Sequence, residues 1–291
     1  MDLQNLVERL RKGDPRAIAR ALTLVENDNP EARELLSRVF GDERSAKIVG
    51  LTGPPGVGKS TLVDGLARLA RDHGRHVAVL AVDPTSPFTG GALLGDRARM
   101  DSATADPKIF IRSMATRGHV GGLTSAVFEA LVLLEAAGKN FILVETVGAG
   151  QDEVEVAAAV DVTVVVLAPG LGDQIQASKA GLMEIADILV VNKADRDGAD
   201  LVAEETHAHT DGKPVFKTVA LDGTGVDALF AEIERTRGER RLMEGWLLNC
   251  LQRAVRERIP PDAWIAAIER VNLRQTTPYD AAAALLESLK S

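Results

Sequence analysis

Hydrophobic residues follow two periodicities along this chain. Between residues 45 and 221, short runs rich in Val, Ile and Leu alternate with stretches of helical spacing. The runs span 46–52, 76–82, 108–113, 140–145, 161–168, 187–192 and 214–220. Most are apolar nearly throughout, as expected of strands buried on both faces of a parallel sheet. The alternation predicts an α/β fold with a doubly wound, mostly parallel sheet, in a domain that we place at 45–237.

A different pattern precedes this region. Apolar residues recur at helical spacing from Leu3, and two further helix starts come at Asp14 and Asn29, each followed by a proline. A capping side chain before a proline at the first helical position is a helix-start signal. We therefore expect an N-terminal helical extension over 1–44.

The C-terminal part also has helical spacing. It predicts one long helix from about 225 to 259, ended by Pro260, and a last helix that begins at Thr277 with Asp280 in the capping box. One stripe of the long helix holds Met243, Leu247, Cys250 and Ala254. We expect 238–291 to form a helical arm that joins two copies in a homodimer; packing on its own domain is the alternative.

Composition narrows the class of protein. The chain has 291 residues, 34 basic and 42 acidic, so its net charge of −8 argues against binding nucleic acid or an anionic membrane. Cys250 is the single cysteine, which excludes an intramolecular disulfide. The first residues hold no long apolar segment, and the run at 162–169 is far shorter than the roughly 20 residues of a membrane helix. We expect a cytoplasmic protein.

The first strand leads into a phosphate-loop motif. The residues from Gly53 to Thr61 read GPPGVGKST, which matches G-x-x-x-x-G-K-[ST] between a strand and a helix. Glycines let backbone N–H groups surround phosphate oxygens, and the following helix directs its positive end at them. We expect the phosphates to contact Gly53, Gly56, Val57, Gly58, Lys59, Ser60 and Thr61. The alternative is a glycine-rich turn.

Two acids end strands near this loop. Asp83 follows the second run and Glu145 ends the fourth. Mg²⁺ prefers oxygen ligands, so we expect Ser60 with Asp83, Glu145 or both in its coordination shell. A lone strand-end acid is otherwise a helix cap or a solvated residue. Gly148 lies three residues after Glu145, where a backbone N–H would sense the γ-phosphate.

The sixth strand ends in a base-reading motif. Asn192, Lys193 and Asp195 form N-K-x-D. The Asp195 carboxylate accepts from the guanine N1–H and 2-amino groups, which adenine lacks, so the motif favours GTP over ATP. Lys193 would lie along the base and Asn192 would hold the loop. After the next strand, Val219 replaces a common serine, and the Ala220 N–H would serve guanine O6.

Five segments resemble one family closely: DPTSPFTGGALLGDRARM (83–100), IRSMATRGHVGGL (111–123), VETVGAGQ (144–151), PGLGDQIQ (169–176) and VVNKAD (190–195). They are similar to the MeaB/ArgK family, P-loop GTPases of the signal-recognition-particle/MinD type. The resemblance is dense from about residue 45 to 195.

The resemblance implies a GTP-hydrolysing chaperone of an adenosylcobalamin-dependent acyl-CoA mutase, with methylmalonyl-CoA mutase foremost. Such members form homodimers through their C-terminal helices and gate cofactor delivery from an adenosyltransferase. It assigns catalysis to Lys59, Asp83, Asp96 and Glu145, with the 83–100 loop as a first switch. A further switch, with Asp173, Gln174 and Lys179, would communicate with the mutase. The cofactors implied are Mg²⁺ and GTP or GDP, and the chain lacks the D-x-H-x-x-G motif that ligates cobalamin.

Other interpretations remain open at this point. A nickel- or other metal-insertion GTPase would carry a His- or Cys-rich segment, whereas the histidines here are scattered and His207-x-His209 is the nearest match. A metabolic P-loop kinase would need a second substrate site. A nucleotide-gated scaffold with negligible turnover is the third alternative. Arg112 is one of four arginines that would neutralise phosphate or supply surface charge; the others are Arg97, Arg99 and Arg117.

Overall fold

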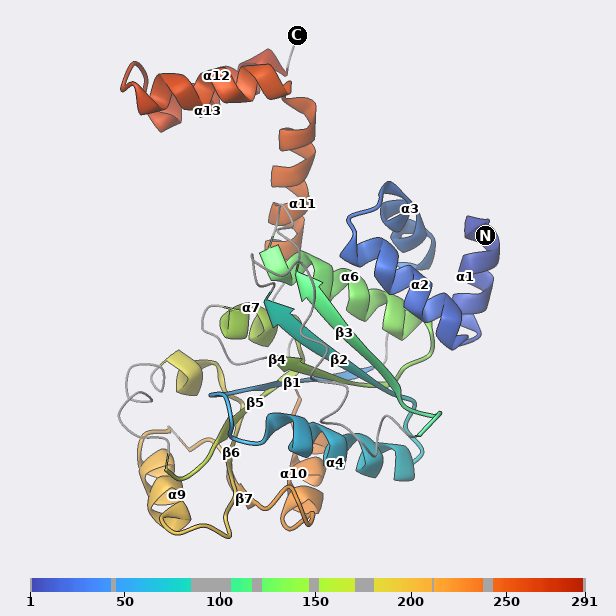
Figure 1. Ribbon diagram of the computed structural model, residues 1–291, viewed down its shortest axis with the longest axis vertical. Helices are drawn as coiled ribbons and strands as arrows, with labels where there is room; N and C mark the ends of the chain where they lie inside the picture. Colours follow the sequence, from blue (N-terminus) through green and yellow to red (C-terminus); the bar gives the residue numbers. More distant parts are fainter. Residues whose placement is uncertain are drawn as a thin grey trace. The chain divides into compact units, whose positions relative to one another are not determined.

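A seven-stranded parallel sheet organises the protein. The structure is a computed structural model that describes residues 2–42, 46–84, 106–116, 122–146, 152–170, 181–210, 212–237 and 243–289. The strands are ordered β3-β2-β4-β1-β5-β6-β7 and every neighbouring pair is parallel (Figure 1). Their bounds are β1 (Lys47–Thr52), β2 (Val77–Pro84), β3 (Phe110–Thr116), β4 (Phe141–Thr146), β5 (Val162–Leu167), β6 (Ile188–Asn192) and β7 (Val215–Thr218). Each predicted run contributes a strand, and the predicted fold class is confirmed.

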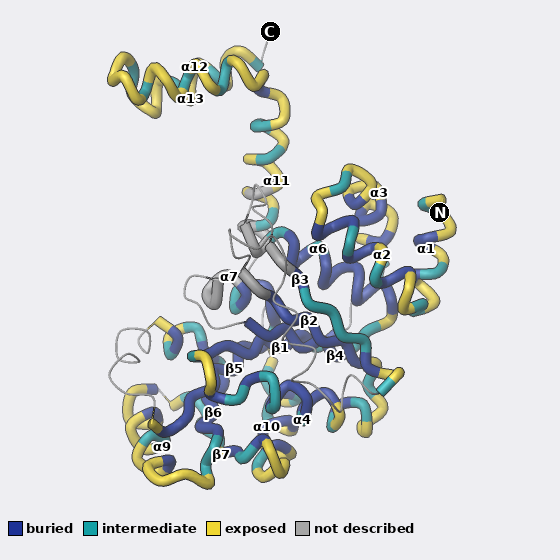
Figure 2. Tube along the Cα trace, in the orientation of Figure 1, coloured by how far each residue is buried: buried dark blue, intermediate teal, exposed yellow. Residues whose placement is uncertain are grey.

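Helices cover both faces of this sheet. Helices α4 (Lys59–Asp72) and α10 (Val226–Arg235) lie below the sheet in Figure 1, and α6 (Gly122–Ala136) and α7 (Asp152–Ala159) lie above it. Helix α9 (Ala199–Ala208) packs against β6 and β7. The central strands are buried along their whole length (Figure 2), because successive side chains face different helical layers.

Aspartates at strand starts help to fix the register of the central strands. The Asp161 carboxylate accepts the Ile48 N–H at 2.8 Å, and the Asp187 carboxylate accepts the Thr163 N–H at 2.8 Å. Each bond satisfies a backbone donor at the start of a strand, where the ladder has not yet begun. The opposite, carboxyl ends of these strands therefore meet at one defined edge.

Three N-terminal helices pack on α6 and β3. They are α1 (Leu3–Arg11), α2 (Pro15–Glu26) and α3 (Pro30–Val39). The predicted starts hold, because Asp14 accepts two backbone N–H groups of α2 and Asn29 accepts one of α3. Arg112 of β3 forms an ion pair of 2.6 Å with Glu26 of α2. This partly buried pair joins the helical layer to the edge strand of the sheet.

The C-terminal residues form a second compact unit. The chain divides into Met1–Leu242 and Met243–Ser291. The second unit holds α11 (Met243–Arg258), α12 (Pro261–Asn272) and α13 (Pro278–Ser288), with Thr277 capping α13 as predicted. Across the described ranges, every helix is too short or too polar to span a lipid bilayer.

The predicted unbroken helix from 225 to 259 is wrong. Helix α10 ends at Arg235, and Thr236 takes an extended conformation with its hydroxyl on the Glu232 carbonyl. The Lys47 ammonium donates to the Thr236 carbonyl, which holds this end against β1. The helix thus ends at a contact with Lys47, which is distant in the sequence, whereas the local helical spacing predicts that it continues.

Candidate nucleotide-binding site

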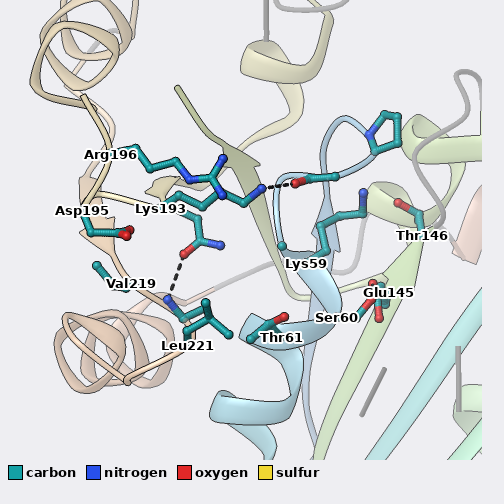
Figure 3. A pocket seen from close by; sticks show the side chains of 15 residues that line it. Lys59, Ser60, Thr61, Glu145, Thr146, Lys193, Asp195, Arg196, Val219 and Leu221 are labelled. Carbon is teal, nitrogen blue, oxygen red and sulfur yellow. Dashed lines mark hydrogen bonds between the residues drawn. The ribbon is translucent and has the colours of Figure 1, made fainter. Parts of the chain in front are cut away.

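A pocket opens at the carboxyl edge of the sheet. The phosphate loop, the end of β4 and the turns after β6 and β7 line this cavity of about 650 Å³ (Figure 3). Ligand pockets commonly have volumes of about 300–1,000 Å³, and open α/β sheets bind ligands beyond the carboxyl ends of their strands. The pocket gathers most of the described residues that the sequence assigned to phosphate, metal and base.

The phosphate loop needs glycine at its first and last glycine positions. Gly53 has a φ of +140°, and a Cβ there would lie 2.2 Å from the Val166 carbonyl oxygen of β5. Gly58 has a φ of +96°, and a Cβ there would lie 2.4 Å from the Asn192 side-chain nitrogen. Both positions combine a left-handed backbone with no room for a side chain. The loop therefore lies tightly between β5 and the base-reading turn.

Lys59 is held inside this loop. Its side chain is buried, and its Nζ donates to the carbonyls of Gly53 at 2.6 Å and Pro54 at 3.0 Å. Lys59 is also the first residue of α4, so the positive end of that helix meets the loop. The arrangement places one ammonium group and a helix N-terminus where β- and γ-phosphates would bind.

Oxygen donors for a metal ion meet beside Lys59. The Ser60 hydroxyl donates to Glu145 Oε1 at 2.6 Å, and both residues line the pocket with Thr146. A hydroxyl next to a buried carboxylate suits Mg²⁺, a hard cation that takes oxygen ligands. Ser60 and Glu145 would therefore hold the ion, which would supply positive charge to offset that of the phosphates. Asp83 lies in β2 next to β4, but the placement of its side chain is outside what the structure describes.

Asn192 connects the base-reading turn to the phosphate loop. It is 2% exposed at the end of β6. Its amide nitrogen donates to the Val57 carbonyl at 2.8 Å. Its amide oxygen accepts from the Thr218 hydroxyl at 3.1 Å and from the Ala220 N–H at 3.0 Å. One side chain thus holds three segments that come from different parts of the sequence.

Lys193 and Asp195 follow on the same turn. Lys193 has a φ of +58°, and its Nζ donates to the Gly56 carbonyl at 2.5 Å, so its methylene stem spans the pocket (Figure 3). Asp195 is exposed and lines the pocket beside it. An exposed carboxylate next to an extended apolar stem matches what a guanine needs: an acceptor for its donor edge and a surface for one face.

The turn after β7 carries Val219 and Ala220. Both line the pocket, but the Ala220 N–H is already donated to Asn192. A contact from this N–H to guanine O6 would need the donor to be shared. Within the same turn, the N–H and the hydroxyl of Thr224 donate to Asp222 and lower the pKa of that carboxyl. The turn is thus closed by its own hydrogen bonds.

The other residues that the sequence singled out have different outcomes. Asp96, Gly148, Asp173, Gln174 and Lys179 are outside the described residues. The candidate phosphate contact of Arg112 is replaced by its bonds to Glu26 and to the Thr23 hydroxyl. Exposed His207 and His209 lie on or directly after α9, and the described residues hold no group of three metal-binding side chains.

Four lining residues were not predicted: Pro55, which occupies a position that the phosphate-loop motif leaves open, and three residues outside that loop. Thr146, Arg196 and Leu221 border the pocket, and each directly follows a residue that was predicted (Figure 3). Adjacency to a motif at a strand end was the available signal. Motif matching alone does not extend to neighbours whose residue type the motif leaves open.

The fold and the site define a P-loop GTPase: a phosphate loop, the Ser60–Glu145 pair and an N-K-x-D turn share one pocket. The family model "Methylmalonyl Co-A mutase-associated GTPase MeaB" matches residues 18–257. A putative GTPase of Pyrococcus horikoshii is 51% identical over 243 residues, covering 80% of this chain and 77% of that one. GTPase ArgK of Escherichia coli is 41% identical over 211 residues, covering 71% and 64%.

A solved structure is similar over the whole length. The crystal structure of an LAO/AO transport system kinase has a TM-score of 0.66 and 26% sequence identity, and the match covers 99% of this chain and 98% of that one. The chain belongs to the MeaB family and is a GTPase that binds GTP and GDP. The predicted family, fold and enzyme class are confirmed.

Proposed function

We propose that this GTPase binds an adenosylcobalamin-dependent acyl-CoA mutase, with methylmalonyl-CoA mutase foremost, and gates the loading and protection of its cofactor. The match to a family described as associated with methylmalonyl-CoA mutase carries this proposal. That match begins in α2 and ends in α11, so it includes the whole nucleotide site. In this proposal the chain does not itself ligate cobalamin, and it binds neither nucleic acid nor a membrane.

The site chemistry supports a slow, partner-stimulated switch. Lys59 and the Ser60–Glu145 pair can position the phosphates and help to neutralise their charge. Positioning and charge stabilisation are the main contributions of a protein to phosphoryl transfer. Partner proteins accelerate other GTPases by about 10³–10⁵-fold through added groups. We therefore expect intrinsic hydrolysis to be slow and the mutase, with an adenosyltransferase as a second partner, to change it.

We further propose that the C-terminal unit joins two copies in a homodimer. Leu247 and Leu251 of α11 are 70% and 57% exposed, and Ile265 of α12 is 56% exposed. Helices α12 and α13 bury no residue among those described (Figure 2). A helical unit with exposed leucines and almost no core of its own gains stability by packing on a second copy.

Binding and hydrolysis measured together test the chaperone role. Purified methylmalonyl-, isobutyryl- and ethylmalonyl-CoA mutases would be titrated against the chain with GDP or a non-hydrolysable GTP analogue, and GTP turnover followed with and without each. Lys59→Ala serves as the matched variant that retains the surface and loses phosphate contacts. We expect nucleotide-dependent binding and faster hydrolysis with one mutase. Absence of both with all three mutases contradicts the proposal.

Light scattering tests the homodimer separately. Leu247→Glu with Leu251→Glu should give a monomer at micromolar concentration, and Leu201→Glu, at an exposed position of α9, is the control. A wild-type chain that is monomeric at that concentration contradicts the homodimer proposal. The mutase proposal is tested separately, by the binding and hydrolysis measurements.

A further inference from the structure

We propose that Thr146 is a positioning residue for GTP hydrolysis, because its buried hydrogen bond to Thr52 holds the end of β4 and thereby orients Glu145. Glu145 is the carboxylate that would hold Mg²⁺ together with Ser60. Thr146 acts on the reaction through this carboxylate, and the phosphate-loop and base-reading motifs include neither threonine. The inference rests on GTP hydrolysis by the chain alone, so it is independent of the mutase proposal.

The two threonines form a pair across β1 and β4. Leu51 of β1 is in register with Glu145 of β4, and the next residue on each strand is a threonine. The Thr146 hydroxyl donates to the Thr52 hydroxyl oxygen at 3.2 Å, and the Leu51 carbonyl is a second, longer acceptor at 3.5 Å. Each threonine is 2% exposed. The pair therefore joins the ends of two central strands, directly before the phosphate loop on one strand and directly after Glu145 on the other.

Glu145 and Thr146 hold the end of β4 from opposite faces of the sheet, because successive side chains of a strand alternate between faces. Glu145 faces α4, where it accepts from the Ser60 hydroxyl at 2.6 Å. Thr146 is the next residue at this strand end (Figure 3), and its bond to Thr52 lies on the other face. A rotation of the strand end would move the carboxylate away from Ser60. The bond between the two threonines opposes that rotation.

Stability alone does not explain hydroxyl groups at these two buried positions. Valine has nearly the shape of threonine, favours strands and buries no polar atom. Replacing both partners of a buried hydrogen bond by apolar groups of the same shape can be nearly neutral. The hydroxyls instead supply a directional contact where the register of β1 and β4 ends. Such placement matters for a metal ligand, because loss of a group that orients one typically costs about 10–100-fold in metal affinity or activity.

Three variants test this role: Thr146→Val, Thr146→Ser and the double variant Thr52→Val with Thr146→Val. Thr163→Val is the matched control. Thr163 is 3% exposed and is in register with Gly50, so it lies on the same face of the sheet as Thr52 but nearer the start of its strand.

Four measurements separate positioning from folding and from nucleotide contact. GTP turnover by the chain alone at saturating Mg²⁺ gives kcat and KM. Calorimetric titration of Mg²⁺ into the complex with a non-hydrolysable GTP analogue gives the metal affinity without hydrolysis. The GDP affinity in the presence of a chelator reports the pocket without the metal, and urea unfolding reports the fold.

We expect Thr146→Val to lower both kcat and Mg²⁺ affinity about tenfold, while KM, the metal-free GDP affinity and the unfolding midpoint stay close to wild type. Thr146→Ser keeps the hydroxyl and should recover most of kcat, and the double variant should lose no more than Thr146→Val, because their bond is already absent. Thr163→Val should equal wild type.

Wild-type kcat and Mg²⁺ affinity in Thr146→Val overturn the inference. An equal loss in Thr163→Val, a further loss in the double variant, or a matching loss of metal-free GDP affinity or of the unfolding midpoint also overturns it. Because no mutase is present in these assays, their outcome is separate from the test of the chaperone role.

Discussion

Replacing Asn192 by alanine should destabilise the nucleotide-binding unit strongly. The side chain is buried and makes the bonds to Val57, Thr218 and Ala220 described above. Alanine removes all of them and leaves a buried carbonyl, a buried hydroxyl and a buried N–H without this partner. Gly58, whose missing Cβ makes room for this amide, would face a void.

The size of the effect follows from these bonds. A net contribution of about 1 kcal/mol per hydrogen bond sets the lower bound, and a buried polar group left without a partner costs about 1–3 kcal/mol. Three such groups give an expected loss of about 3–9 kcal/mol, a large share of the roughly 5–15 kcal/mol that stabilises a typical protein. Thr218→Val removes one bond and should cost about 1 kcal/mol.

Urea unfolding of the nucleotide-free protein measures this loss. Both tryptophans, Trp246 and Trp264, lie in the C-terminal unit, so fluorescence would report the wrong part of the chain. Far-ultraviolet circular dichroism and hydrogen exchange at β1 and β6 follow the sheet instead. The protein concentration is held constant, because a dimer would otherwise change the apparent stability.

The losses of unfolding free energy in Asn192→Ala and Thr218→Val are compared to test the role of the Asn192 amide. If Asn192→Ala costs no more than Thr218→Val, the amide does not hold the phosphate loop and the reasoning fails. Asn192→Asp is a second check: it keeps an acceptor for Ala220 but sets an oxygen against the Val57 carbonyl. It should therefore lie between the other two variants in stability.

Three further predictions concern the phosphates, the base and the helical layer. Lys59→Ala should abolish GTP hydrolysis in a phosphate-release assay while circular dichroism stays unchanged, because it removes the ammonium inside the phosphate loop. Asp195→Asn should weaken GTP far more than ATP in a binding titration; equal losses would contradict the guanine assignment. Burial raises the pKa of Glu129 on α6 to about 7, against a weaker opposing effect of Arg33. The stability that neutral Glu129 contributes is complete below its unfolded pKa of about 4.3 and is lost as pH rises through 7. Glu129→Gln should therefore have a free energy of unfolding about 2 kcal/mol above that of wild type at pH 8, and only slightly above it at pH 5. Urea unfolding at the two pH values measures this difference.

Local signals predicted the fold and the ends of the strands. Each buried strand carries its own apolar run, and the phosphate loop and N-K-x-D element are contiguous motifs at strand ends. Parallel strands bring their carboxyl ends to one edge, so topology alone places Ser60 near Glu145 and Lys193 near Gly56. No long-range information was needed for this part.

Contacts between distant segments were not predictable in the same way. The end of α10 depends on Lys47, and the role of Arg112 depends on Glu26 in the N-terminal layer. Helix α12 was missed because Pro260 and Pro261 end one helix while Pro261 occupies the first turn of the next. A single sequence contains both interpretations, and only packing distinguishes them.

The pocket is preformed by side chains that hold the carbonyls of the phosphate loop. The donors are Lys59, Asn192 and Lys193, and the carbonyls belong to Gly53, Pro54, Gly56 and Val57. Because two of the three donors come from the base-reading turn, the phosphate loop and the guanine site form one hydrogen-bonded unit. A loop fixed before the ligand arrives loses little conformational entropy on binding, which favours tight nucleotide binding. Loss of the base-reading turn should therefore weaken phosphate binding even for a ligand that has no base.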